Sequence, residues 1–176
     1  ILDFYDGVAF PECPNRDLAA VRGELDGVLQ DVRFVELLNR YGLKGTFNLN
    51  SGIFGTRDHK ISNGIDTDFS RIDEQEVKAL YEGHEISAHT STHPSLTEIS
   101  IEAGKEEVIK DCEKLKALAG YSITGFAYPY GTYNDKVEKM LDECGITYAR
   151  TVVSTEDFEY IRKERIRCQR RKENIM

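Results

Sequence analysis

The hydrophobic and polar positions of this chain alternate between a strand-like and a helix-like period. Short, mostly apolar runs that are typical of buried strands cover residues 19–25, 44–50, 85–88, 123–128 and 146–150. Helical spacing predicts helices over 32–41, 73–82, 101–119 and 135–143. Strands separated by helices of this length are joined by crossovers, so the pattern predicts an α/β fold with a parallel sheet and helices outside it.

The ends of the predicted helices carry recognisable signals. In the first helix, Val32, Val35 and Leu38 recur at helical spacing, Asp31 is the predicted N-cap, and Gly42 follows the last turn. Gly145 follows the last predicted helix in the same way. These signals favour a βαβ unit at the start of the fold.

Several polar residues fall just after predicted strands. Asp26, the segment 89–93 and the turn 128–131 all follow a strand end. In parallel α/β folds, ligands bind at the carboxyl ends of the strands. We therefore expect a functional site at that edge of the sheet.

Length and charge narrow the class of protein. A chain of 176 residues with 40% hydrophobic residues predicts one domain, over 1–160, followed by a basic tail at 161–176. Residues 162–172 hold seven Lys or Arg against one Glu, so with a net charge of −8 the remainder carries −8 − 6 = −14. Such a body repels nucleic acid. For the tail, a solvated helix end is favoured over an anion-binding arm.

The apolar runs and the cysteines exclude further classes. No run approaches the roughly 20 residues of a membrane span, so no membrane partner is expected. No signal peptide pattern is visible, but the chain begins at Ile1 inside a further predicted strand over residues 1–5, so the sequence does not indicate a compartment. The four cysteines are scattered singly, which speaks against a disulfide framework or a thiolate metal site. The sequence does not indicate an oligomeric state.

Two of the four histidines lie close together in the chain. His89 and His93 are separated by three small polar residues and followed by Pro94. On one side of a helical turn, two neutral imidazoles at this spacing can hold one divalent cation, and a third, anionic ligand is expected. Metal binding is favoured over two surface histidines. We interpret His59 as a solvated residue of a polar loop over 54–63, and His84 as a structural residue.

Three segments together resemble one protein family. GHEISAHTSTHP resembles the histidine motif of the polysaccharide deacetylase, or NodB-homology, family. FAYPYGTYND resembles its third motif, usually R-x-P-Y-G, and YGLKGTFNLN resembles its second strand. The resemblance runs in order from about Ala19 to Phe158 and is most specific at the histidines.

The resemblance implies a fold, an activity and a cofactor. It implies a distorted (β/α), TIM-like barrel and a hydrolase that removes N- or O-acetyl groups from an acetylated glycan. It also implies one divalent metal held by Asp-His-His, zinc in the first place with cobalt and nickel as alternatives, and His89 and His93 match the two histidines. Because a closed barrel of this type needs about 250 residues, we expect an incomplete one.

The aspartate ligand has two candidates. The family's first motif, T-F-D-D-G, is matched imperfectly by residues 4–7, which contain Asp6, and by residues 24–27, which contain Asp26. Spacing favours Asp26, because it lies one turn and one helix before Thr46. Asp6 is the alternative candidate for this ligand.

The residues that the family uses for proton transfer depart from its pattern. Tyr5 or Leu25 stands where the general base belongs, and Ala127 stands where the arginine that orients it belongs. No histidine follows His93 to match the late general acid. Glu24 is the carboxylate nearest to the missing base.

The third motif supplies the remaining candidates. By resemblance, the backbone N–H of Tyr130 is an oxyanion donor. Tyr128, Pro129 and Tyr133 are candidates for substrate binding. The rings of Tyr128, Tyr130 and Tyr133 have a polar tip and can pack against sugar faces, although these tyrosines equally fit core and rim positions. Two functions follow: a metal-dependent glycan deacetylase, impaired or truncated, or a non-catalytic glycan-binding or structural relative with the same fold.

Overall fold

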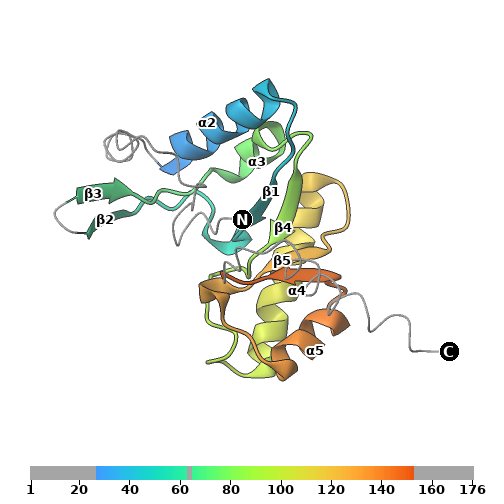
Figure 1. Ribbon diagram of the computed structural model, residues 1–176. Coiled ribbons are helices and arrows are strands. Elements are labelled where there is room, and N and C mark those ends of the chain that lie inside the picture. The colour runs from blue at the N-terminus through green and yellow to red at the C-terminus, as the bar shows by residue number, and fades with distance from the viewer. Residues whose placement is uncertain (1–26, 63–64, 153–176) are drawn as a thin grey trace.

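The main element of the fold is a sheet of four parallel strands. The computed structural model describes residues 27–62 and 65–152. The strands are β1 (Thr46–Leu49), β4 (Glu85–Ala88), β5 (Gly125–Ala127) and β6 (Tyr148–Arg150). They lie in the order β1-β4-β5-β6 (Figure 1). The predicted parallel α/β arrangement is confirmed, while the strand predicted at 19–25 lies outside the described residues.

Four α-helices accompany the sheet in the described part of the chain. They are α2 (Gly27–Arg40), α3 (Glu74–Leu80), α4 (Ile101–Ala119) and α5 (Asp135–Glu143). Helix α4 begins after Ser100, whose side chain accepts a hydrogen bond from the N–H of Ala103, and ends at the left-handed Gly120. Two short 3-10 helices, η1 (Ser51–Ile53) and η2 (Pro129–Gly131), follow the carboxyl ends of β1 and β5.

Helix α2 begins earlier than the sequence predicts. It starts at Gly27, so Asp31 lies inside the helix and is not the N-cap. The Asp31 carboxylate instead accepts a hydrogen bond from the Tyr81 hydroxyl at 2.8 Å, and burial raises the pKa of Asp31 to about 6. The predicted end is confirmed, because Gly42 follows the helix with a φ of 65°.

The raised pKa of Asp31 predicts a pH-dependent stability. The native pKa lies above the value of the unfolded chain, so the native state binds more protons between about pH 4 and pH 6, and the free energy of unfolding falls as the pH rises through this window. We expect Asp31→Asn to raise the free energy of unfolding by roughly 1 to 3 kcal/mol at about pH 8 and by less than half of that amount at about pH 4.5.

Urea unfolding at both pH values measures this difference, with Asp142→Asn, which removes an exposed carboxylate from α5, as the control. A gain from Asp31→Asn that is the same at both pH values would contradict the assignment.

The two faces of the sheet differ in polarity. Phe47 of the apolar face packs against Phe34 of α2 and against Tyr81, the residue that caps the carboxyl end of α3. On the opposite, polar face, Glu85 accepts hydrogen bonds from the hydroxyls of Thr46, at 2.7 Å, and Tyr148. Within the described residues β1 and β6 are the open edges of the sheet, as expected for an incomplete barrel.

A β-hairpin interrupts the connection from β1 to α3. Strands β2 (His59–Ser62) and β3 (Ile65–Asp68) pair antiparallel and extend away from the four-stranded sheet (Figure 1). The predicted polar loop over 54–63 is therefore wrong for its second half. His59 begins β2, is exposed as predicted, and lies 3.3 Å from the Asp66 carboxylate.

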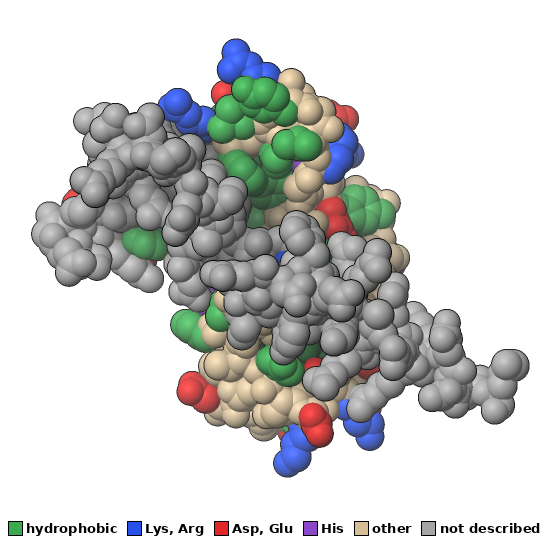
Figure 2. Space-filling view, in the orientation of Figure 1, with side chains coloured by type: hydrophobic (Ala, Val, Ile, Leu, Met, Phe, Trp, Pro, Cys, Tyr) green, Lys and Arg blue, Asp and Glu red, His purple; other side chains and the backbone are tan. Residues whose placement is uncertain are grey.

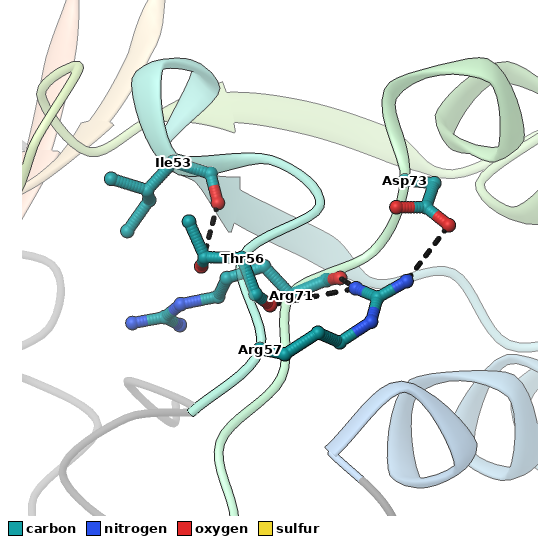
Figure 3. A network of polar contacts seen from close by, with 5 residues as sticks. All are labelled: Ile53, Thr56, Arg57, Arg71 and Asp73. Atoms are coloured by element: carbon teal, nitrogen blue, oxygen red, sulfur yellow. Dashed lines mark hydrogen bonds and ion pairs between the residues drawn. The ribbon is translucent and has the colours of Figure 1, made fainter. Parts of the chain in front are cut away.

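A network of polar contacts holds the base of this hairpin, as Figure 3 shows. The Arg57 guanidinium donates to the carbonyl of Arg71 at 2.7 Å and to the carboxylate of Asp73 at 2.9 Å. Asp73 directly precedes α3, and the Thr56 hydroxyl donates to the carbonyl of Ile53 in η1. Arg57 thus ties both chain segments of the hairpin to the start of α3.

The core lies between the apolar face of the sheet and the helices. Its fully buried side chains include Val77 of α3, Val108 of α4, Phe126 of β5 and Val137 of α5. Figure 2 shows apolar side chains at the surface over the end of α2, where Leu37, Tyr41 and Leu43 are exposed. Over residues 27–62 and 65–152, none of the helices combines the length and the apolar character that crossing a bilayer requires.

Candidate active site

The loop that follows β4 carries both histidines of the predicted metal site. We call residues His89–His93 the histidine loop. His89 is fully buried, and its Nδ1 lies 2.8 Å from the carbonyl oxygen of Ala127. Because a carbonyl oxygen can only accept, Nδ1 carries the proton and Nε2 carries the lone pair of the neutral ring. The rings of His89 and His93 lie edge to face with their centroids 4.7 Å apart, and the Nε2 atoms of both are buried.

The backbone of the histidine loop is not helical. The prediction that both rings lie on one helical turn is wrong, because Thr90 and His93 adopt left-handed conformations with φ of 67° and 66°. Non-glycine residues rarely occupy this region, and such strain concentrates at functional sites. The two rings therefore meet through a strained loop whose geometry the surrounding structure maintains.

Residues after β1 hold the loop from one side. The Asn50 side-chain amide donates to the carbonyls of His89 at 2.6 Å and Thr90 at 2.9 Å. The N–H of Gly52 donates to the carbonyl of Ser91 at 2.8 Å. A Cβ at Gly52 would lie 2.7 Å from this same carbonyl oxygen, so the close approach requires glycine.

Two carboxylates of α4 hold the loop from the other side. Asp111 is fully buried and accepts hydrogen bonds from the N–H groups of Ser51 and His89. Burial raises the pKa of Asp111 to about 6, although these hydrogen bonds lower it in part. Glu107, one turn earlier, accepts from the N–H and the hydroxyl of Thr92.

Sequence reasoning missed Asp111, although the chain contains a signal for it. Val108, Asp111 and Leu115 share the buried stripe of α4, so a carboxylate stands where an apolar residue is expected. Buried carboxylates need hydrogen-bond donors.

Tyrosines line the site next to His93. Tyr130, in η2, has a φ of 60°, is 52% exposed, and places its ring 4.8 Å from that of His93. Tyr133 is 42% exposed and stacks on Tyr128 at 5.2 Å. Tyr128 and Pro129 are buried, with Tyr128 only 4% exposed. Of the predicted substrate-binding residues, Tyr128 and Pro129 are therefore buried, whereas Tyr133, like Tyr130, presents ring surface to solvent.

The structure does not describe all of the predicted site residues. Asp6, Glu24 and Asp26 fall outside the described residues, as does the basic tail. Within 27–62 and 65–152, no cluster of three or more His, Cys, Asp or Glu side chains is placed to hold a metal ion. His84 is structural as predicted: it is buried, its Nδ1 accepts from the N–H of Gly45, and its Nε2 lies 3.2 Å from the Asn39 side-chain oxygen.

Comparisons of the sequence find deacetylases. The chain is 31% identical over 134 residues to a peptidoglycan-N-acetylglucosamine deacetylase of Bacillus cereus, which covers 76% of this chain and 43% of that protein. It is also 31% identical over 83 residues to peptidoglycan-N-acetylglucosamine deacetylase PgdA of Listeria monocytogenes, over 47% of this chain and 17% of that protein. The chain thus spans less than half the length of either relative.

Comparisons of the structure find the same kind of fold. IcaB from Ammonifex degensii superposes with a TM-score of 0.58 at 17% identity, over 72% of this chain and 56% of that one. The Streptococcus pyogenes deacetylase PplD superposes with a TM-score of 0.57 at 20% identity, over 68% of this chain and 49% of that one. A mutant of BA3943, described as a pseudoenzyme with restored enzymatic activity, superposes with a TM-score of 0.52 at 19% identity. The match covers 74% of this chain and 43% of that one.

The strongest finding is at the level of the family. A sequence profile described as polysaccharide deacetylase matches residues 27–149, which is more than half of the chain and includes the histidine loop and the turn at η2. This chain therefore belongs to the polysaccharide deacetylase family.

Proposed function

We propose that this chain is the hydrolase domain of a metal-dependent enzyme that removes acetyl groups from an acetylated polysaccharide. The observation that carries the proposal is the histidine loop, in which the fully buried His89 and the adjacent His93 meet at 4.7 Å beside the carboxyl ends of β4 and β5. Family membership supports the same activity. The names of the curated relatives support an acetylated amino-sugar polymer as the substrate.

The donor atoms of the histidine loop fit a divalent metal. The hydrogen bond from His89 Nδ1 to Ala127 leaves Nε2 as the donor atom, and metal-binding histidines commonly use the second ring nitrogen in this way. Zinc is the metal that this chemistry favours, with cobalt and nickel as alternatives. The carboxylate ligand that we assign is Asp26, with Asp6 as the alternative.

The metal would supply Lewis-acid activation of the acetyl carbonyl and of the attacking water. The chain would supply the rest. The backbone N–H of Tyr130, which has a left-handed φ of 60°, would donate to the oxyanion that develops on the acetyl group. Glu24 is our candidate for accepting the proton of water. The exposed rings of Tyr130 and Tyr133 would bind sugar faces, and the products would be acetate and the free amine or hydroxyl of the sugar.

Acetate release tests this proposal directly. We expect the zinc- or cobalt-loaded chain to release acetate from oligomers of N-acetylglucosamine, chelation to abolish the release, and added metal to restore it. The rate should be low, because loss of a general acid or base typically costs roughly 10² to 10⁴-fold. A metal-loaded chain that binds oligomers but releases no acetate would contradict the hydrolase assignment.

One observation favours a second function, that of a non-catalytic glycan-binding relative. Ala127 stands where the family has the arginine that orients its base, and its side chain is buried and apolar. Calorimetric titration with the oligomers separates the two functions, because the non-catalytic relative would bind them without acetate release.

A further inference from the structure

Two acidic side chains of α4 differ from the others on that helix. Glu102, Glu106 and Glu113 are exposed, whereas Asp111 is fully buried and Glu107 is half-buried. Glu107 and Asp111, which we call the acidic pair, are four residues apart and therefore lie on the same side of the helix. Their carboxylates bind backbone N–H groups of the histidine loop and of η1.

Asp111 joins the ends of two neighbouring strands. The ladder between β1 and β4 ends at the pair Leu49 and Ala88. Beyond this point, Asp111 Oδ1 accepts from the N–H of Ser51 at 2.8 Å, and Oδ2 accepts from the N–H of His89 at 2.9 Å. One buried carboxylate thus fixes where the His89 backbone leaves the sheet.

Glu107 fixes the other end of the histidine loop. Its Oε2 accepts from the N–H of Thr92 at 2.8 Å, and its Oε1 accepts from the Thr92 hydroxyl at 3.0 Å. Thr92 directly precedes His93, whose own N–H donates to the Thr90 hydroxyl at 3.1 Å. The backbone at His89 and the backbone next to His93 are therefore both held by one helix, α4.

This arrangement offsets the strain of the loop. Left-handed conformations of non-glycine residues cost free energy and persist where surrounding contacts over-determine them. Thr90 and His93 are two such residues, and they lie between or beside the hydrogen bonds of the acidic pair. Charge-assisted hydrogen bonds from backbone N–H groups are the stronger kind.

We propose that the acidic pair of α4 positions His89 and His93 for metal binding by holding the backbone of the histidine loop. The inference rests on the proposed function in so far as the positioned group is a metal site. Asp111 and Glu107 bind backbone N–H groups and the Thr92 hydroxyl and would act on the metal through the two histidines, so they are positioning residues. Asp111 has the larger role, because it is buried and binds two chain segments.

The test uses the full chain with Co²⁺ as the probe. In Asp111→Asn the amide group turns one donor toward a backbone N–H. One of the two hydrogen bonds that Asp111 accepts is therefore lost without a change in side-chain size. We expect Co²⁺ affinity to fall roughly 10- to 100-fold, as for other residues that orient metal ligands, with a change in the visible Co²⁺ absorption bands. Glu107→Gln should show a smaller loss, because the Thr92 hydroxyl can accept from the amide.

Two control variants separate positioning from stability and from charge. Val108→Ala removes two methyl groups from the buried face of α4 and should lower stability while leaving Co²⁺ affinity and absorption unchanged. Glu106→Gln removes one exposed negative charge from the same helix and should also leave both unchanged. Wild-type affinity and absorption in Asp111→Asn, or an equal loss of affinity in Val108→Ala, would overturn the proposal.

A measurement without metal distinguishes failure of this inference from failure of the proposed function. Long-range ¹H–¹⁵N NMR reads which nitrogen of His89 carries the proton. We expect the Nδ1–H form in the native chain and in Val108→Ala, and a shifted ratio in Asp111→Asn. If the native chain bound no Co²⁺ but this shift occurred, the metal site would fail and the positioning role would stand. An unchanged ratio in Asp111→Asn would overturn the positioning role itself.

Discussion

Replacing His93 by alanine is expected to abolish metal binding and acetate release. His93 supplies one of the two imidazoles whose ring centroids lie 4.7 Å apart, and its Nε2, like that of His89, is buried. Changes that only disturb the orientation of a ligand already cost roughly 10- to 100-fold in metal affinity. Loss of a ligand should therefore cost more than roughly 100-fold, which competition with a coloured zinc chelator measures.

The chain offers a matched control for this variant. His59 is exposed on the hairpin, away from the histidine loop, so His59→Ala should keep both zinc affinity and acetate release. Urea unfolding checks that His93→Ala still folds, since the ring also packs against Tyr130. Zinc affinity in His93→Ala equal to that of the native chain would remove the histidine loop from the site.

The largest loss of stability is expected from Phe126→Ala. Phe126 is fully buried on the middle of β5, pairs with Ala88 and Ala149 of the neighbouring strands, and contacts the Tyr128 ring. Truncating a buried phenylalanine leaves a cavity and typically costs about 3 to 5 kcal/mol. A loss of this size is a large part of the free energy of unfolding of an ordinary domain.

Urea unfolding of Phe126→Ala and of Leu37→Ala measures this difference. Leu37 is 41% exposed on α2, so its truncation should cost about 1 kcal/mol or less. Phe126→Leu should fall between the two, because it leaves a smaller cavity. Equal losses in Phe126→Ala and Leu37→Ala would show that β5 is not part of the stabilising core.

Local patterns were sufficient for most of the regular elements. The bounds of β4, α4 and α5 agree with their predictions from hydrophobic period and end signals. These signals act over a few neighbouring residues, because helix and strand periods are set by backbone geometry. The hairpin was missed because its strands, HKIS and IDTD, have few apolar residues, although Asn63-Gly64 between them is a strong hairpin signal.

The sequence by itself also determined the neighbourhood of the candidate site. His89, His93 and the turn at Tyr130 were predicted to lie near one edge of a parallel sheet, and the described structure brings them together. This succeeded because carboxyl ends of parallel strands meet at the same edge. The aspartate ligand stays a prediction, because both candidates lie outside the described residues.

Only the tertiary structure decided how the two histidines are held. The contacts that matter join residues far apart in the chain: Asp111 lies 60 residues after Ser51 and 22 after His89, and Asn50 lies 39 before His89. Neither period nor spacing reports such pairs. The same holds for Tyr128, whose burial depends on its neighbours in space and not on its own polarity. Residue types determined which groups are available to a metal, while long-range packing and hydrogen bonds determined which backbone conformation presents them.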